Sequence, residues 1–418
     1  MDSLSAFSLG SKIKLLCLSN GHGEDVIAVR ILQELQQLTS IDIAALPIVG
    51  EGHAYSQLSI PIVGAVQTMP SGGFIYMDGR QVLRDLQGGL LKLTLSQIQV
   101  VRNWAKGGAI LAVGDIVPLL FAWASGANYA FVGTAKSEYY RRDESGWHQR
   151  RSLLSRLENL SGSVYHPLDR YLMSHPRCKA VFPRDTLTTK TLQKWAIPAF
   201  DLGNPMMDGL EAHNLLKLEP DPQRLTILLL PGSRPPEAYE NWQKILVAVT
   251  ELIAAFPTRS LLFLAAIAPT LTLEPLCQSL VDAGFSQEDL TFQQKNALII
   301  LTQNAYNDCL HQADLAIAMA GTATEQFIGL GKPAIAFPGN GPQYTYAFAE
   351  AQSRHLGSSL TLVEHPKQVA DAVRSILQDP TRLQQIAENG YQRMGEPGAA
   401  HRIAQCLVQQ FNYPNKES

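Results

Sequence analysis

The sequence predicts an α/β protein with two domains of similar size, each built on a parallel β-sheet. Apolar segments of strand length alternate with longer amphipathic segments along most of the 418-residue chain. This alternation is typical of βα units, which place helices on both faces of a parallel sheet. A chain of 418 residues is also long enough for two domains of roughly 200 residues each.

In the first half, the pattern predicts a strand over 13–19, a loop over 20–24 and a helix over 25–38. The elements expected after these are a strand over 41–49, a helix near 81–104 preceded by a glycine-rich stretch over 71–79, a strand over 109–113, a helix after Asp115 and a strand over 129–132. The segment 108–133 is apolar enough to resemble a membrane span. Because Asp115, Pro118, Gly126 and Asn128 interrupt it, we expect a buried strand–helix–strand unit instead.

The second half repeats this style. Its expected strands are 225–230, 260–266, 298–301, 315–319 and 334–337, and its expected helices are 242–256, 273–283 and segments near 325, 346 and 369. The proline-rich stretch 204–224 is the expected boundary. We therefore predict Rossmann-like domains over 1–205 and 206–398 that face a cleft holding a ligand. One large α/β domain is the alternative.

Composition excludes several classes of function. The net charge of −3 gives no reason to expect a nucleic-acid partner. The five cysteines are scattered and include no C-x-x-C pair, as expected for reduced thiols. Residues 1–11 show neither the basic region nor the apolar region of a signal peptide, so we expect a cytoplasmic protein.

Two glycine-centred turns in the second half are the strongest signals for a ligand site. Gly232, Ser233 and Arg234 directly follow an expected strand. The glycine permits close backbone approach, the serine offers a hydroxyl, and the arginine can bind phosphate oxygens through two N–H groups. A plain turn without a ligand is the alternative.

The second turn reads Gly321-Thr322-Ala323-Thr324-Glu325 and opens an expected helix. A helix N-terminus attracts phosphate, and a carboxylate one turn further along can accept both hydroxyls of a ribose. In the alternative interpretation, Thr322 caps the helix and Glu325 completes a capping box. Two such turns in one half of the chain indicate a nucleotide-diphosphate ligand.

A third segment of the second half, 339–344, follows the next expected strand. Its Gln343 and Tyr344 carry amide and phenol groups that suit sugar hydroxyls. A solvent-exposed loop is the alternative.

In the first half, candidates for a catalytic base lie at two strand ends. Gly21 and Gly23 would let a large group approach, while His22 and Glu24 are both plausible bases. Asp115 is the third candidate, since an acidic residue in so apolar a segment is costly unless it is paired or functional. Its alternative role is to cap the helix that follows.

The segment 136–156 carries six Lys or Arg residues interleaved with Tyr139, Tyr140 and Trp147. This combination suits the surface of an anionic membrane. A solvated charged face is the alternative.

Three stretches together resemble the glycosyltransferases of the GT-B fold, and specifically lipid-A-disaccharide synthase. They are Leu229-Leu230-Pro231-Gly232-Ser233-Arg234, Gly203-Asn204-Pro205-Met206-Met207-Asp208 and Gly321-Thr322-Ala323-Thr324-Glu325. Their order and separation match as well, so the likeness covers most of the chain. The resemblance is closest to the synthase-related proteins of cyanobacteria. The stretch 321–333 is also similar to the lipid II-forming transferase and to galactolipid synthases.

The resemblance implies a UDP-sugar held mainly by the second domain. Residues 232–234 would bind the diphosphate, Glu325 the ribose, and Gln343 or Tyr344 the sugar. No metal ion or cofactor is implied. A lipid or lipid-linked acceptor would reach the first domain from a membrane, which makes the protein peripheral to that membrane. The final helix, 399–412, would return to the first domain.

The sequence departs from the synthase on the acceptor side. The synthase has a Gly-Glu-x-Ser-Gly-Asp loop where this chain has Asn20-Gly21-His22-Gly23-Glu24-Asp25, and only Asp115 matches its aspartate-rich segment. These differences concern the acceptor and the base more than the donor. The expected function is therefore an inverting, metal-independent glycosyltransferase. A UDP-N-acetylglucosamine 2-epimerase-like enzyme and a non-catalytic binding module are the alternatives.

Overall fold

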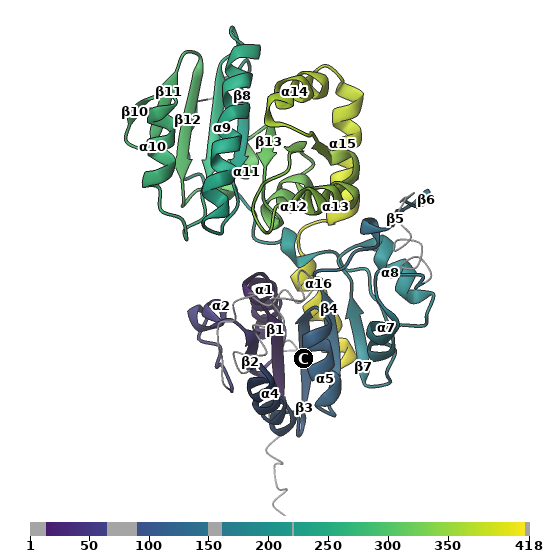
Figure 1. Ribbon diagram of the computed structural model, residues 1–418. Helices are drawn as coiled ribbons and strands as arrows, with labels where there is room; N and C mark the ends of the chain where they lie inside the picture. Colours follow the sequence, from purple (N-terminus) through teal and green to yellow (C-terminus); the bar gives the residue numbers. More distant parts are fainter. Residues whose placement is uncertain (1–13, 65–89, 149–160, 220, 414–418) are drawn as a thin grey trace, which may run out of the picture. The chain divides into compact units, whose positions relative to one another are not determined.

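The computed structural model describes residues 14–64, 90–148, 161–219 and 221–413, which form two compact units (Figure 1). Unit 1 comprises the residues up to 138, residues 143–208 and those from 397 onward. Unit 2 comprises residues 139–142 and 209–396. The main division thus falls at 208/209, against an expected boundary at 205/206. The assignment of 139–142 to unit 2 is not anticipated by the sequence.

Unit 1 is built on a five-stranded sheet in the order β2-β1-β3-β4-β7, in which all neighbouring strands run parallel. Its strands are β1 (Lys14–Asn20), β2 (Asp42–Val49), β3 (Gly108–Gly114), β4 (Asn128–Gly133) and β7 (Cys178–Phe182). Its helices are α1 (His22–Leu38), α2 (His53–Gln57), α4 (Leu90–Trp104), α5 (Ile116–Ala124), α7 (Pro167–Met173), α8 (Thr186–Gln193) and α16 (Ala399–Gln410). The short strands β5 (Arg142–Asp143) and β6 (Gly146–Trp147) form a separate two-stranded sheet.

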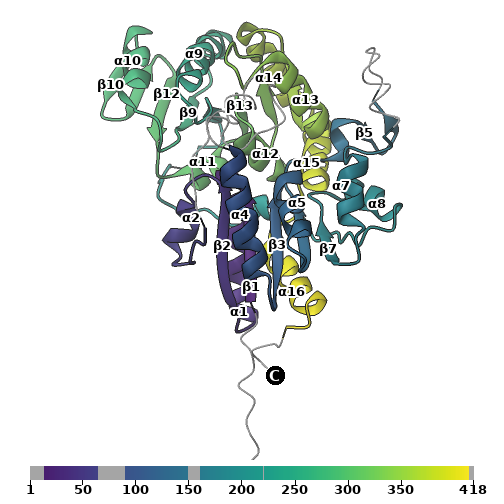
Figure 2. The same cartoon turned by 60° about the horizontal axis from the view of Figure 1, so that its bottom comes forward.

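Alternate residues of β1 serve two hydrophobic clusters, one on each face of the sheet. Leu15 and Cys17 pack with α1 and α16, whereas Leu16 and Leu18 pack with α4, α5 and α7. This follows from the alternation of side chains along a strand. Figures 1 and 2 both show α16, in yellow, beside α1.

The apolar segment 108–133 forms β3, α5 and β4, which confirms the buried strand–helix–strand prediction. No helix in the described ranges is long and apolar enough to cross a membrane. The expected helix near 81–104 is described only from Leu90 onward, and the glycine-rich stretch 71–79 lies outside the described residues.

The predicted loop over 20–24 is wrong in its second part. Helix α1 begins at His22, so His22, Gly23 and Glu24 form its first turn. Gly21, with φ of 134°, makes the sharp entry from β1 that permits this early start. The first turn of α1 therefore lies directly against the end of β1.

Unit 2 is built on an eight-stranded sheet in the order β10-β11-β12-β9-β8-β13-β14-β15. Its strands are β8 (Leu225–Leu230), β9 (Leu261–Ala266), β10 (Ser286–Glu288), β11 (Thr291–Gln294), β12 (Ala297–Thr302), β13 (Leu315–Ala318), β14 (Ala334–Ala336) and β15 (Leu360–Leu362). Its helices are α9 (Glu237–Ala255), α10 (Glu274–Asp282), α11 (Tyr306–Gln312), α12 (Thr322–Gly329), α13 (Tyr346–Leu356), α14 (Val369–Leu377) and α15 (Pro380–Met394).

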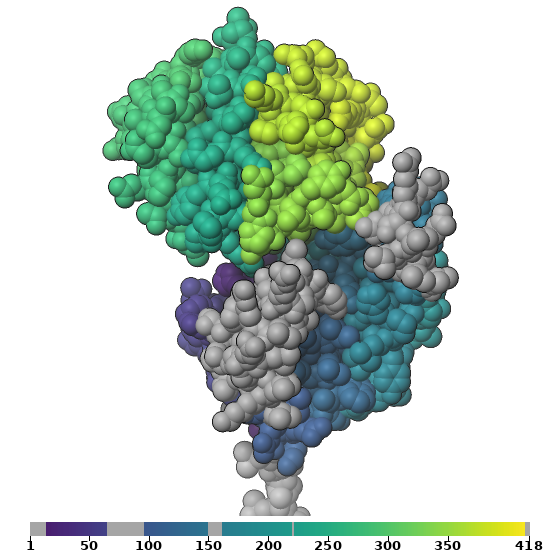
Figure 3. Space-filling model, in the orientation of Figure 1, coloured from purple at the N-terminus to yellow at the C-terminus, as the bar shows by residue number. Residues whose placement is uncertain are grey.

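All neighbouring strands of this sheet run parallel except at one edge, where β10, β11 and β12 are antiparallel. In the space-filling view these edge strands form one side of unit 2, and α14 and α15 form the other (Figure 3). Every residue of β8, β9 and β13 is buried. The centre of the sheet is therefore well covered, and ligands are expected at the ends of its strands.

Two carboxylates hold the chain on either side of the division between the units at 208/209. Asp208 accepts hydrogen bonds from the backbone N–H groups of Gly398, Ala399 and Ala400 at the start of α16. Asp308, in α11, accepts four such bonds from residues 213–216. Although burial opposes it, these four donors hold the pKa of Asp308 below its ordinary value.

Candidate functional site

The central strands β8 and β13 of unit 2 run parallel as neighbours, so the loops that follow them meet at one edge of the sheet. Gly232, directly after β8, has φ of 99°, and a Cβ on it would lie 3.3 Å from the carbonyl oxygen of Met319. Only glycine satisfies both constraints without strain. The side chains of Ser233 and Arg234 are exposed beside it.

The Gly232 turn is held by side chains from neighbouring elements. The Asn241 amide in α9 donates to the Pro231 carbonyl over 3.0 Å, and the Thr270 hydroxyl donates to the Ser233 carbonyl over 2.9 Å. Both bonds are accepted by backbone carbonyls, so they hold the loop without using the side chains of Ser233 and Arg234 as acceptors. The predicted phosphate-binding residues thus sit on a fixed backbone.

Helix α12 begins directly after β13 with Gly321 as its N-cap, and no side chain caps it. The alternative in which Thr322 caps the helix is therefore wrong, because Thr322 is the first helical residue. Thr322 is exposed and Ala323 half-buried, whereas the buried Thr324 hydroxyl donates to the Ala320 carbonyl over 2.6 Å. The first backbone N–H groups of α12 remain directed out of the helix N-terminus.

Glu325 lies one turn inside α12 and is 7% exposed. Its Oε1 is 3.7 Å from Nε2 of His355, in the last turn of α13. The carboxylate is thus close to the N-terminus of α12, where the sequence predicts a ribose-binding group, and is bounded on one side by an imidazole ring.

The third loop, 339–344, is tied to α9 by Glu237, a residue that the sequence reasoning missed. Its Oε1 accepts the backbone N–H groups of Gln343 and Tyr344 over 3.2 and 2.6 Å. A Cβ on Gly341 would lie only 2.3 Å from the Glu237 side chain. Helix α9 begins at Glu237, five residues before the predicted start at 242, which brings this carboxylate under the loop.

Gln343 and Tyr344 differ in what their side chains contact. Gln343 is half-buried, whereas Tyr344 is 4% exposed. The Tyr344 hydroxyl hydrogen-bonds to the Ala318 carbonyl and to Gln352, over 3.2 and 3.1 Å. Gln352 in turn donates to the carbonyls of Ala320 and Gly321. Tyr344 therefore joins the third loop to the start of α12 from inside the unit.

In unit 1, the ends of β1, β3 and β4 bring together Glu24 and Thr134. Glu24, in the first turn of α1, accepts a hydrogen bond from the Thr134 hydroxyl over 3.2 Å. Gly114, at the end of β3, has φ of 134°, and a Cβ there would lie 3.3 Å from the Glu24 side chain. Burial raises the pKa of Glu24 from 4.5 to about 7. A group with this pKa can take up and release a proton near neutral pH.

Asp115 follows β3 and caps α5, as the alternative interpretation predicts. One of its oxygens accepts from the Val117 N–H over 2.9 Å and from the Asn20 amide over 3.2 Å. Burial raises the pKa of Asp115, and the hydrogen bonds oppose that rise. Asp115 can therefore cap α5 and still be a candidate base at this edge of the sheet.

A buried ion pair that the sequence did not predict lies beside these groups. Lys136 Nζ is 2.7 Å from the Asp169 carboxylate, which also accepts the His166 N–H over 2.7 Å. The charges of both residues act on Asp115, since Lys136 lowers the pKa of that carboxyl and Asp169 raises it. Of the other predicted residues, His22 and Gly23 are exposed in the first turn of α1, and Gly21 precedes them.

The three aromatic residues of the segment 136–156, which is predicted to contact a membrane, differ in exposure. Tyr139 is 1% exposed, whereas Tyr140 is half-buried and its ring stacks on His355. Trp147 is 37% exposed. Residues 149–156 lie outside the described residues. Trp147 is thus the most exposed of the three aromatic residues, and membrane contact stays a prediction.

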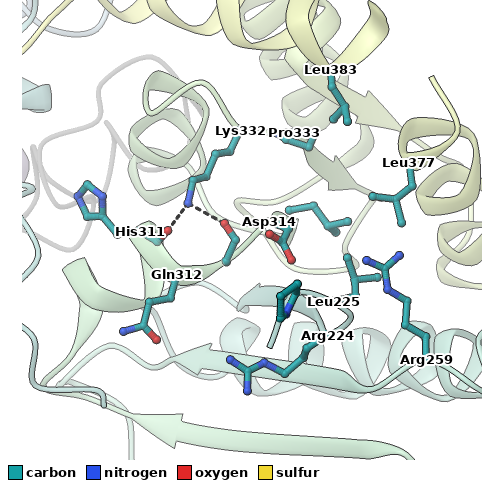
Figure 4. A pocket seen from close by; sticks show the side chains of 13 residues that line it. Arg224, Leu225, Arg259, His311, Gln312, Asp314, Lys332, Pro333, Leu377 and Leu383 are labelled. Atoms are coloured by element: carbon teal, nitrogen blue, oxygen red, sulfur yellow. Dashed lines mark hydrogen bonds between the residues drawn. The ribbon is translucent and has the colours of Figure 1, made fainter. Parts of the chain in front are cut away.

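Unit 2 also contains a pocket of about 400 Å³ at the opposite edge of its sheet, where β8 and β13 begin (Figure 4). Arg224, Arg259, Asp314 and Lys332 line it. Lys332 Nζ donates to the carbonyls of Leu310, His311 and Ala313, and burial lowers its pKa to about 8. Lys332 thus holds the end of α11. The predicted site residues lie at the other ends of these strands.

Within the described residues, no group of three or more His, Cys, Asp or Glu side chains could hold a metal ion. No family model matches the chain, and no curated protein sequence does.

Solved structures do share its fold. UDP-GlcNAc 2-epimerase from Neisseria meningitidis, bound to UDP-GlcNAc, is 16% identical with a TM-score of 0.57, over 95% of this chain and 100% of that one. MurG from Acinetobacter baumannii is 16% identical with a TM-score of 0.55, over 95% and 99%. A glycotransferase of kitacinnamycin is 13% identical with a TM-score of 0.56, over 96% and 99%.

These likenesses extend over nearly the whole chain and define the fold class. Together with the two parallel sheets, they show that the protein has the α/β architecture of the GT-B fold, with two Rossmann-like domains. The predicted fold class is confirmed.

Proposed function

We propose that the protein is a glycosyltransferase that moves a sugar from a UDP-sugar to a hydroxyl group of a lipid or lipid-linked acceptor, with inversion at the anomeric carbon. The observation that carries the proposal is the edge of the unit 2 sheet. There the Gly232 turn with Arg234 and the N-terminus of α12, with Glu325 one turn inside, follow adjacent parallel strands. Structures of the same fold hold UDP in S. aureus MnaA and UDP-GlcNAc in the N. meningitidis enzyme.

On the donor side, Ser233, Arg234 and the first N–H groups of α12 bind the diphosphate. The Glu325 carboxylate accepts the two ribose hydroxyls. Gln343 approaches the sugar, and Tyr344 holds the loop that carries Gln343. Each assignment uses a group whose hydrogen-bonding chemistry matches the part of the ligand that it binds.

In the reaction, Glu24 removes the proton from the acceptor hydroxyl, whose oxygen attacks the anomeric carbon. The bond from that carbon to the UDP oxygen breaks, and its electron pair leaves with UDP. Arg234 and the N-terminus of α12 offset the charge of the leaving group, so the step requires no metal ion. Burial raises the pKa of Glu24 to about 7, which suits this transfer. Asp115 and His22 are the other candidates.

The lipid acceptor rests on the resemblance to lipid-A-disaccharide synthase and on the basic segment 136–156. A lipid acceptor implies that the protein is cytoplasmic and acts at the membrane surface. Binding to anionic vesicles, lost at high salt, is the expected result; equal binding to neutral vesicles would contradict an electrostatic contact.

The first experiment is thermal stabilisation by a panel of nucleotides: UDP, UDP-GlcNAc, UDP-glucose, UDP-galactose, GDP-mannose, ADP-glucose and NAD. A ligand that binds only the folded state raises the melting temperature. We expect the uridine nucleotides alone to stabilise the protein and Glu325→Ala to lose this effect. The absence of a shift with any nucleotide would overturn the donor site.

A UDP-GlcNAc 2-epimerase is the second candidate, favoured by the several epimerases that share the fold. It requires no acceptor. Conversion of UDP-GlcNAc to its 2-epimer in the absence of acceptor, followed by NMR, would support the epimerase and contradict the transferase. Stabilisation by UDP without turnover under either condition would indicate a non-catalytic binding module.

A further inference from the structure

Residues 139–142 belong to unit 2, although unit 1 residues flank them on both sides. Tyr139 is 1% exposed, and the Arg393 guanidinium lies over its ring at 4.1 Å from the centroid. The ring of Tyr140 stacks on His355, with centroids 4.6 Å apart and planes 18° apart. These two aromatic residues anchor the segment.

Side-chain hydrogen bonds hold the part of unit 2 against which the segment packs. Arg354 pairs with both carboxylate oxygens of Glu350 and also donates to the Tyr140 carbonyl. Arg393 donates to the carbonyls of Arg354 and His355. The last turn of α13, against which the segment packs, is thus held by side chains from α13 and α15.

His355 links this surface to the proposed nucleotide site. Its side chain is fully buried, with Tyr140 against one face and the Glu325 carboxylate 3.7 Å from Nε2. Because Glu325 is itself 7% exposed, few positions are open to its carboxylate. If the His355 ring shifts, the space available to the Glu325 carboxylate changes, and so does the orientation of the ring dipole beside it.

We propose that Tyr140 is a positioning residue of the nucleotide site, which sets the place of the Glu325 carboxylate by fixing the His355 ring. The inference rests on the proposed function, in which Glu325 accepts the ribose hydroxyls. A carboxylate that receives two adjacent hydroxyls must be held in one orientation, since hydrogen bonds weaken steeply with misalignment. Tyr140 thereby supports selection of ribonucleotides over deoxyribonucleotides without touching the ligand.

The test compares Tyr140→Ala with Tyr140→Phe by calorimetric binding of UDP and 2′-deoxy-UDP. Loss of one aromatic stack predicts a roughly two- to tenfold weaker binding of UDP for the alanine variant. Binding of 2′-deoxy-UDP should change less, so the preference for UDP falls. The phenylalanine variant keeps the stack and should match the wild type.

Glu325→Ala supplies the reference background. It should abolish the preference for UDP over 2′-deoxy-UDP, and Tyr140→Ala added to it should have no further effect on that preference. An unchanged preference in Tyr140→Ala would overturn the positioning role. Circular dichroism checks that each variant folds; if Tyr140→Ala does not fold, His355→Gln replaces it, with the same expected loss of preference.

Failure of the proposed function would look different. If wild-type protein binds no UDP, the nucleotide site itself is overturned. Crystal structures of wild type and Tyr140→Ala then test whether Tyr140 sets the position of the Glu325 carboxylate. Displacement of the Glu325 carboxylate in the variant would support it, and an unchanged Glu325 would overturn it.

Discussion

The two units share a parallel α/β architecture but present opposite chemistry at the ends of their central strands. In unit 1, the edge is acidic: Glu24 and Asp115 lie there, and burial raises the pKa of both. In unit 2, the edge offers the Gly232 turn, the exposed Arg234 and the N-terminus of α12. There the Glu237 carboxylate is turned inward and holds the loop that carries Gln343.

Under the proposed function, proton transfer belongs to unit 1 and diphosphate binding to unit 2. Carboxyl groups with raised pKa values suit proton transfer, whereas glycine turns, an arginine and a helix N-terminus suit the binding and departure of a diphosphate. The strands of both units serve as similar scaffolds, and the loops that follow them decide the chemistry.

The largest expected effect separates proton transfer from nucleotide binding. Glu24→Gln keeps the size of the side chain but removes the base, so turnover should fall by about a hundredfold or more. Binding of UDP should remain at the wild-type level. Turnover is measured as UDP release in the presence of acceptor lipids, and binding by calorimetry.

Glu34→Gln is the matched control, because it removes the same charge from the other half of α1. It should leave turnover unchanged. Wild-type turnover in Glu24→Gln would transfer the role of base to Asp115 or His22.

The second prediction concerns the stability of unit 1 alone. Leu407, in α16, is fully buried in the cluster that α1 and β1 share. Leu407→Ala should destabilise unit 1 by about 3 kcal/mol, through lost burial and a cavity. Differential scanning calorimetry should show one transition lowered and the other unmoved.

Gln409→Ala changes an exposed position of the same helix and should move neither transition. Equal lowering of both transitions by Leu407→Ala would show that the units unfold together.

The third prediction uses the two ends of strand β8. Arg234 follows the strand and Arg224 precedes it, where it lines the pocket at the other edge. Arg234→Ala should weaken UDP binding by about tenfold, the value of one charge-assisted contact to phosphate. Arg224→Ala should bind UDP normally in the same titration. The reverse outcome would place the nucleotide in the pocket at the start of the strands.

The smallest expected effects are pH slopes of opposite sign. Burial raises the pKa of Glu24 to about 7 and of Asp25 to about 6. Folded unit 1 therefore holds protons that the unfolded chain releases, and its stability falls as pH rises through 6 and 7. The pKa of Asp308 is lowered, so unit 2 loses stability as pH falls below about 4.

Melting temperatures of the two transitions between pH 3 and 8 test these slopes. Asp25→Asn should reduce the slope of unit 1, because only Glu24 then contributes to it among these two, and should leave the slope of unit 2 unchanged. A rise in the stability of unit 1 from pH 5 to 8 would contradict the assignment.

Much of the fold is predictable because buried parallel strands are continuous apolar runs. The predicted strand 225–230 coincides with β8, and 109–113 lies within β3. The antiparallel edge formed by β10 and β11 was missed, because these strands are short and partly polar. The starts of α1 and α9 were placed too late, because Gly23 and polar residues in the first turn of α1, and the prolines that precede the first turn of α9, are also typical of loops.

The predicted site residues are those that local sequence patterns mark, namely glycines, an arginine and carboxylates at strand ends. Contacts that join distant segments leave no such mark. Glu237 reaches the loop around Gln343, and Lys136 pairs with Asp169, only through the tertiary fold. The roles of the predicted residues in binding and catalysis stay predictions.

Helix α16 has a consequence for the order in which the protein is made. It completes the hydrophobic cluster around α1, yet it follows the whole stretch 209–396 in the chain. At about 5–20 residues per second, the ribosome takes roughly 10 to 40 seconds to add that stretch. During synthesis the apolar face of α1 that α16 covers therefore stays open, and unit 2 is complete before unit 1. The interval is a window in which a chaperone can hold the first unit, and in which aggregation competes with its completion.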